Sequence, residues 1–356
     1  MHKIAFNWRI KVLIFILIVS ISAGILVINS VSLNNTESNK KVIPTNCTIF
    51  TVSDESNVYF GNSEDGGENR KYAEIWFSPA RNDQTYGCAF LGFNGNESGG
   101  INVGNIGIGG INTEGLCFDA NEILPASLVN YSPEQGLLST YLWCWEDILR
   151  ECSSVSEVIK WYQTHNMGGW WETQIHWADK TGDAVIVSPT PDHKIAFTRK
   201  TGDFLVSTNF NPVDHSQGWY PCQRYELVTS RLERISTGKN IDRKDLIPIL
   251  YAVSSPKTVN YIGTAYSNIF ELKSQTIYFY IQRDFDHELI YNLNEELKKG
   301  SHTFKISSET NMLSFTPYWE LIFPTIFTIC IIGIGSSLHS IYKKSFQRIS
   351  KRKTKQ

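Results

Sequence analysis

Cys47 is the residue whose type and setting most clearly suit covalent chemistry. A cysteine attacks carbonyl groups as its thiolate, and near neutral pH the free thiol is mostly protonated. If the peptide bond between Asn46 and Cys47 were cleaved, Cys47 would carry an α-amino group. The pKa of such a group is roughly 7.7 to 8.0, which suits a general base. Asp65 ends a polar stretch at 61–65 that we predict to be a turn, and its carboxylate could orient and charge-balance the amine.

The elements that must position these residues begin just before Cys47. From there, short runs rich in β-branched and aromatic residues alternate with Gly, Asn and Asp clusters, a pattern typical of antiparallel strands and hairpins. We predict strands at 49–52, 58–60, 72–77, 87–93, 108–118, 173–178, 184–187, 195–198, 204–207 and 276–282. The glycines of 99–110 lack the spacing of a phosphate-binding loop, so we interpret them as turns and tight strand contacts.

Helices are expected between these groups of strands. Apolar residues at helical spacing predict a helix within 137–149, and Ser154 with Glu157 forms a capping-box signature for a second one. Two more helices are predicted at 225–236 and 243–253. Strands followed by helices, twice over, indicate an α+β fold in which helices cover antiparallel sheets.

The composition excludes several classes of function. Hydrophobic residues make up 42% of the chain, charged residues 19%, and the formal net charge is −2, which is typical of a globular protein. The absence of a basic excess argues against nucleic acid as a partner, and no cysteine or histidine spacing predicts a metal site, so we expect no cofactor. Seven cysteines are an odd set, and whether one or two disulfides form is left open.

Two apolar segments indicate a membrane protein. The first, 12–28, follows a basic start, and we interpret it as an anchor that is later lost, with a signal peptide as the alternative. The second, 318–337, begins with aromatic residues and precedes a basic tail at 338–356, as expected of a transmembrane helix with a cytoplasmic tail. We therefore expect the lipid bilayer as a partner, a cell-membrane location, and an extracytoplasmic domain at 47–310.

Several motifs occur in a fixed order along the chain. Beside the Cys47-Thr48 start and 61–65, they are Gly-Ile-Asn-Thr-Glu-Gly-Leu at 110–116, Ala-Asp-Lys-Thr-Gly-Asp at 178–183, Ser-Thr-Asn at 207–209 and Gln-Arg-Tyr at 223–225. In this order the chain resembles the choloylglycine hydrolase and penicillin V acylase group of N-terminal nucleophile hydrolases, with its acyltransferase and acid-ceramidase-like relatives. The resemblance covers roughly residues 47–227, with a weaker likeness out to about residue 286.

The resemblance implies a four-layer αββα sandwich, removal of a propeptide that ends at residue 46, and hydrolysis of linear, non-peptide amides of N-acylated small molecules. It makes Cys47 the nucleophile, with its freed amine as the base and Asp65 holding that amine. The side-chain amide of Asn209 and a backbone N–H near Asn121 would bind the oxyanion. Arg224 would complete the charge network around the sulfur. Because such a nucleophile needs no other base, His176 and His215 are interpreted as structural.

The chain also departs from the group. Asn62 stands where the bile-salt-hydrolysing branch has arginine, which argues against a bile-acid substrate. Ser63 and Gly66 differ from the acyltransferase-like branch, and Asn121 matches its motif only with a gap.

Other readings of the same residues stay open. Cys47 alone is also compatible with a buried structural cysteine, Asp65 and Arg224 with ordinary ion pairs, and Asn209 with a turn cap. A related cysteine dipeptidase or an acyltransferase is an alternative enzyme, and a catalytically inactive, membrane-anchored binding module is an alternative of another class. The sequence leaves the oligomeric state open.

Overall fold

The computed structural model describes residues 47–66, 73–94, 105–130, 136–137, 144–166, 170–236, 240–256 and 263–305. The apolar segments at 12–28 and 318–337, the spacer before Cys47 and the basic tail lie outside these residues. Within the described part, no helix has the length and apolar character needed to cross a membrane.

A six-stranded sheet carries the segment that begins at Cys47. Its strand order is β12 (Phe204–Ser207), β1 (Thr48–Ser53), β2 (Val58–Gly66), β15 (Gly263–Glu271), β16 (Thr276–Ile281) and β17 (Glu288–Asn292). Neighbouring strands are all antiparallel. β1 and β2 form a hairpin at the centre of this sheet, so both strands are paired on each side.

A second, eight-stranded sheet packs against the first. Its order is β11 (Ile195–Arg199), β10 (Ala184–Pro189), β9 (Trp170–Ala178), β6 (Cys117–Leu128), β5 (Asn105–Asn112), β4 (Cys88–Asn94), β3 (Ala73–Ser78) and β18 (His302–Lys305). Two small pairs complete the strands: β13 (Phe210–Asn211) with β14 (Asp214–Gly218), and β7 (Gly136–Leu137) with β8 (His165–Asn166).

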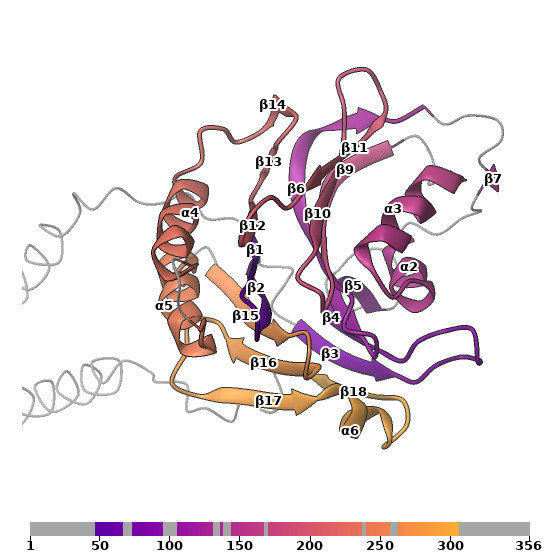
Figure 1. The fold of residues 1–356 in the computed structure, drawn as a ribbon, viewed down its shortest axis with the longest axis vertical. Helices are drawn as coiled ribbons and strands as arrows, with labels where there is room; N and C mark the ends of the chain where they lie inside the picture. The colour runs from indigo at the N-terminus through magenta and orange to yellow at the C-terminus, as the bar shows by residue number, and fades with distance from the viewer. Residues whose placement is uncertain are drawn as a thin grey trace, which may run out of the picture. The chain divides into compact units, whose positions relative to one another are not determined.

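Helices cover the outer face of each sheet (Figure 1). The apolar faces of α4 (Gln223–Ser236) and α5 (Arg243–Val253) pack on the six-stranded sheet, burying side chains such as Phe50, Val228 and Leu250. α2 (Trp145–Glu151) and α3 (Val155–Thr164) pack on the eight-stranded sheet in a second apolar cluster. A short helix, α6 (Leu293–Leu297), follows β17. The predicted α+β fold and αββα layering are confirmed.

Polar side chains join the two sheets at their inner faces. Asn62 of β2 donates a hydrogen bond from Nδ2 to Oδ2 of Asp119 in β6, at 2.7 Å. His176 of β9 contacts the hydroxyls of Thr51 and Ser207, each at 2.9 Å, so one imidazole links β9 to two strands of the other sheet. These hydrogen bonds satisfy groups that would otherwise be costly to bury.

The prediction of a turn at 61–65 is wrong. These residues form the second half of β2, between β1 and β15, and all of them are buried. A polar composition is typical of a turn, but Asn62 and Asp65 have hydrogen-bond partners on facing strands instead of in water. The strand predicted at 108–118 is two strands, β5 and β6, joined by a tight turn in which Gly115 has a φ of 76°.

The helical elements differ from the sequence pattern in two places. Leu137, placed by its spacing in a helix, lies in β7, and α2 begins only at Trp145. Residues 138–143 lie outside the described part of the chain. The helix at 243–253 has its predicted bounds, and α4 starts two residues before the predicted 225.

Candidate active site

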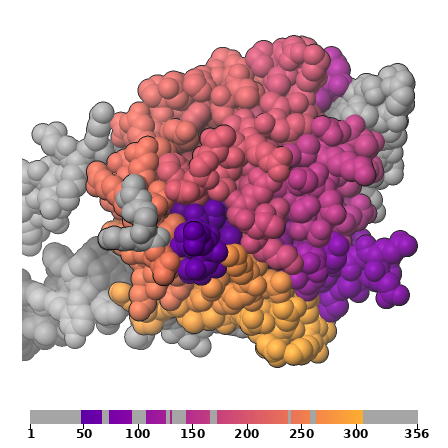
Figure 2. Space-filling model, in the orientation of Figure 1, coloured from indigo at the N-terminus to yellow at the C-terminus, as the bar shows by residue number. Residues whose placement is uncertain are grey.

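The β1–β2 hairpin has two ends, and the candidate residues lie at only one of them. Its turn carries the exposed residues Glu55 and Ser56. Figure 2 shows that part of the hairpin, drawn in indigo, reaches the surface of the molecule. Cys47 stands at the opposite end of β1, where Thr48 pairs with Ser63 of β2. Strand pairing therefore brings the start of β1 beside the end of β2, where Asp65 lies.

Cys47 is 7% exposed, and its Sγ lies 3.9 Å from the backbone oxygen of Asp65. The run Thr-Ile-Phe-Thr-Val that follows alternates between the two faces of the sheet. Thr51 points toward the other sheet, where it meets His176, and Phe50 points toward the helices. By this alternation Cys47 lies on the same side as Thr51, between the sheets.

Asp65 accepts hydrogen bonds from two hydroxyls. Ser255 Oγ donates to Oδ2 at 2.7 Å, and Thr264 Oγ1 donates to Oδ1. Ser255 follows α5 and Thr264 lies in β15, so both partners come from the last third of the domain. Sequence reasoning missed both, because neither belongs to a recognisable motif and they stand 190 and 199 residues from Asp65.

Arg224 lies in the first turn of α4 and is 1% exposed. Its Nη1 donates to the backbone oxygen of Cys47 and to Oγ1 of Thr48, the latter at 2.8 Å. Its Nη2 donates to Oδ1 of Asn209 at 3.1 Å. The guanidinium thus binds the backbone on the carbonyl side of Cys47 and joins two residues that sequence reasoning singled out.

Asn209 follows β12 and lies beside the middle of β6. Its Nδ2 donates to the backbone oxygen of Glu122 at 3.1 Å, while Arg224 binds its Oδ1. Because an amide nitrogen carries two hydrogens, it can donate to Glu122 and to a second acceptor at once. Further along the chain the backbone lies next to Asn209 again, where Trp219 N donates a hydrogen bond to Asn209 O at 2.8 Å.

Asn121 directly precedes Glu122, whose backbone oxygen Asn209 contacts. Strand β6 therefore brings Asn121 close to Asn209. Asn121 pairs with Gln174 of β9 and is fully buried. Neither atom of its side-chain amide has a hydrogen-bond partner among the described residues. Whether its backbone N–H serves an oxyanion stays a prediction.

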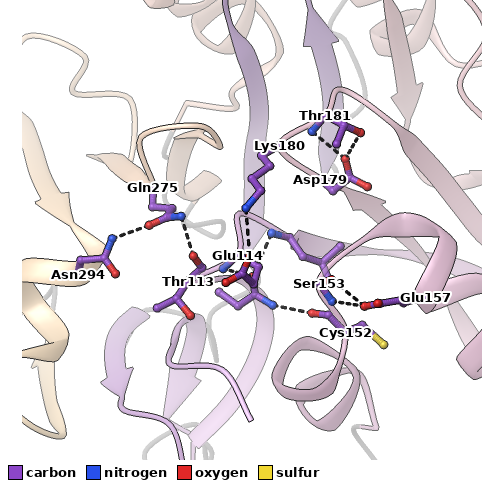
Figure 3. Close-up of polar contacts among 12 residues, drawn as sticks. Thr113, Glu114, Cys152, Ser153, Glu157, Asp179, Lys180, Thr181, Gln275 and Asn294 are labelled. Carbon is purple, nitrogen blue, oxygen red and sulfur yellow. Dashed lines mark hydrogen bonds and ion pairs between the residues drawn. The ribbon is translucent and has the colours of Figure 1, made fainter. Parts of the chain in front are cut away.

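The two remaining motifs have structural roles. Asn112 accepts from the backbone N–H groups of Glu114 and Leu116 and donates to the carbonyls of Leu149 and Cys152, which fixes the β5–β6 turn against α2. Asp179 accepts from the backbone of Thr181 and from Val155 N at the start of α3. Lys180 joins the two motifs through an ion pair with Glu114 at 3.0 Å (Figure 3).

The buried imidazole of His176 is unsuited to act as a base. Burial lowers its pKa from 6.5 to about 3, so at neutral pH it is an uncharged partner of two hydroxyls. The exposed ring of His215 stacks on Tyr220 with centroids 3.9 Å apart. These positions agree with the structural interpretation of both residues.

No disulfide joins the cysteines in the described part of the chain, and all of them are buried: Cys47, Cys88, Cys117, Cys144, Cys152 and Cys222. Burial raises the pKa of the Cys88, Cys144 and Cys152 thiols to about 12, which disfavours their reactive thiolate form.

Comparison with solved structures gives the same fold. Two structures of variants of the conjugated bile acid hydrolase from Clostridium perfringens are similar, with TM-scores of 0.56 and 0.55 and 15% identity. Each match covers 73% of this chain, and the matches cover 97% and 96% of the two hydrolase chains, respectively. Penicillin V acylase from Agrobacterium tumefaciens has a TM-score of 0.50 and 14% identity, over 75% of this chain and 93% of that one.

Comparisons with protein-family models and with curated protein sequences give no match. The resemblance stated from the motifs is confirmed as a likeness to these solved structures, and at this identity the likeness shows the fold.

Proposed function

We propose that this chain is a cysteine amidase that hydrolyses linear, non-peptide amide bonds of N-acylated small molecules after a propeptide is removed before Cys47. The observation that carries the proposal is the meeting of four residues from distant parts of the sequence. Cys47, Asp65, Asn209 and Arg224 lie at one end of the β1–β2 hairpin, linked by the contacts of Arg224 and Cys47. The fold shared with a bile acid hydrolase and a penicillin acylase supports the same reaction class.

In the proposed reaction the free α-amine of Cys47 takes the thiol proton, and the thiolate attacks the substrate carbonyl carbon. The oxygen gains negative charge, which the Asn209 amide and the backbone N–H at Asn121 would stabilise. Collapse breaks the C–N bond, and the leaving amine takes the proton from the α-ammonium group. A thioester on Cys47 remains. Water then attacks it while the α-amine accepts a proton, so the acid leaves and the thiol is restored.

We propose that the acyl group on the amide substrate is apolar. After Asn209, the segment 213–220 carries three exposed large apolar side chains, Val213, Trp219 and Tyr220, at 43%, 46% and 52%. We call this segment the 213–220 patch. The hydrogen bond from Trp219 N to Asn209 O places it next to the proposed oxyanion donor. An exposed aromatic surface at this position suits a fatty acyl or other hydrophobic group.

A bile acid is a poorer candidate. Asn62, at the position where the bile-salt branch has arginine, is fully buried and bonded to Asp119 between the sheets. It therefore presents no cation to a substrate. Transfer of the acyl group to an acceptor amine, or cleavage of a dipeptide, remains the alternative for the same thioester chemistry.

We also propose that the domain is held at the cell membrane on the extracytoplasmic side. The support is the sequence pattern alone: apolar segments at 12–28 and 318–337, each flanked by basic residues. A membrane location would bring the domain close to lipid-like amides.

Intact mass and N-terminal sequencing of purified protein test the proposal. We expect the wild-type chain to start at Cys47 and Cys47→Ala to keep the bond after Asn46. Cys222→Ala is the matched control, because Cys222 is 8% exposed against 7% for Cys47, and it should be processed normally. A thiol-directed electrophile should label wild type at Cys47.

Processed enzyme is then offered N-acyl amides of increasing chain length, dipeptides, and an amide with an added acceptor amine. Release of fatty acid from the amides alone supports the amidase. A folded wild type with an intact bond before Cys47 would overturn the proposal and favour an inactive binding module.

A further inference from the structure

The two residues whose hydroxyls donate to Asp65 are also hydrogen-bonded to each other. Ser255 N donates to Thr264 Oγ1 at 2.7 Å, and Thr264 N donates to Ser255 O at 3.0 Å. The two residues therefore bind each other through two hydrogen bonds before either one reaches Asp65. We call this pair the Ser255–Thr264 clamp.

The clamp leaves one direction for the Thr264 hydroxyl proton. A hydroxyl has a single hydrogen and accepts through its lone pairs. Because Oγ1 of Thr264 already accepts from Ser255 N, its own hydrogen is free to be donated, and Asp65 Oδ1 is the acceptor in place. Ser255 Oγ occupies the second carboxylate oxygen at 2.7 Å. Donors on both oxygens fix the rotation of the carboxylate.

A β-bulge puts Thr264 in this position. In the β2–β15 pair Tyr266 lies opposite Glu64, so regular pairing would place Ala265 opposite Asp65. Instead Thr264 lies opposite Asp65, and Ala265 is the extra residue. A bulge of this kind re-aims a side chain and is over-represented next to active sites. Without it, a methyl group would occupy the place of the hydroxyl.

Gly263 allows the close approach that the clamp needs. Its φ is +77°, and a Cβ there would lie 2.4 Å from Ser255 O. Any side chain at 263 would push the clamp apart.

We propose that Ser255 and Thr264 are positioning residues that hold the Asp65 carboxylate in the orientation needed to bind the α-amine of Cys47. The inference rests on the proposed amidase function and adds to it the residues that set the position of its charge-balancing group. They act through Asp65 and touch no substrate.

The test uses processed enzyme, produced from the full-length chain, and an N-acyl amide substrate. Thr264→Val keeps the shape and removes the hydroxyl, and Thr264→Ser restores it. We expect kcat to fall about tenfold or more in Thr264→Val with KM nearly unchanged, because binding of the acyl group is untouched. Thr264→Ser should recover most of the rate. The matched control is Ser267→Ala on the same strand, whose buried hydroxyl has no hydrogen-bond partner among the described residues and should be dispensable.

A double-mutant cycle separates positioning from general stability. In an Asp65→Asn background, adding Thr264→Val should change the residual kcat by less than about twofold, since the clamp acts only through the carboxylate. An equal fall in both backgrounds, or wild-type kcat in Thr264→Val, would overturn the inference.

The control for the underlying function is thiol labelling and N-terminal sequencing of each variant. Loss of labelling and turnover in the wild type itself refutes the amidase, whereas a labelled, active wild type with an indifferent Thr264→Val refutes only the clamp.

Discussion

Asn209 is the residue on which transition-state stabilisation is expected to depend. Its amide nitrogen donates to Glu122 O and has a second hydrogen to offer, and Arg224 fixes the other end of the amide. Loss of one oxyanion donor typically costs about 10²- to 10³-fold in kcat. We expect Asn209→Ala to show a loss of this size with little change in KM, measured on processed enzyme. Exposed Asn130→Ala is the control, and an Asn209→Ala enzyme as fast as this control would contradict the role.

His176 is expected to make stability depend on pH. Its pKa is about 3 when folded, against 6.5 as its ordinary value, so below pH 6.5 the unfolded chain binds a proton that the folded chain excludes. Stability from this group is therefore fully present above pH 6.5 and falls as the pH drops toward 3. The slope approaches about 1.4 kcal/mol per pH unit.

Urea unfolding of wild type and His176→Gln at pH 7.5 and pH 5 measures this. The wild type should lose more stability on acidification than the variant, which keeps a polar side chain between Thr51 and Ser207. Exposed His215→Gln should follow the wild type. Equal losses in wild type and His176→Gln would show that another group governs acid unfolding.

At the level of strands and helices, the sequence correctly predicted those elements whose formation depends on residues close together in the chain. The β1 run, the strand at 204–207 and the helix at 243–253 have alternation, helical spacing or caps within a few residues, and the structure has them where expected. The prediction for 61–65 failed, because the burial of this segment comes not only from the neighbouring β1 but also from β15 and β6, which lie far away in sequence. The same reason explains why Ser255 and Thr264 were missed, while Asp65, Asn209 and Arg224 were found through motifs.

The β1–β2 pairing depends on Gly61. A Cβ there would lie 2.3 Å from Cζ of Phe50, whose ring covers the glycine from the facing strand. We expect Gly61→Ala to lower the free energy of unfolding by about 1 to 3 kcal/mol through overpacking. Phe50→Leu, combined with Gly61→Ala, should cost less than the sum of the two single changes, because the smaller side chain makes room.

Urea unfolding of the wild type, both single variants and the double variant gives the coupling. Strict additivity, or an unchanged Gly61→Ala protein, would mean that the two strands can move apart without cost.

Taken as a whole, the domain gathers its chemistry at one end of the central hairpin. β1 and β2 supply Cys47 and Asp65, while α4 and the segment after β12 supply Arg224 and Asn209. The other sheet contributes Asn121 and Glu122 through β6. Because residues of both sheets meet at this end, a change in the site can also change the stability of the sandwich, and each activity variant above is measured together with its urea unfolding.

The last expectation concerns the attachment of this domain to the membrane. The segment 318–337 is long enough to span a bilayer core, and the positive charges after it favour a cytoplasmic tail. Full-length protein should remain in the membrane pellet after a high-pH wash, and a tag after residue 356 should resist protease added to intact cells. An arginine at the centre of a spanning helix costs about 2.5 to 3.5 kcal/mol, so Phe327→Arg with Ile329→Arg should release the processed domain. Wild-type protein in the soluble fraction, or a tag digested in intact cells, would refute this topology without affecting the proposed chemistry of Cys47.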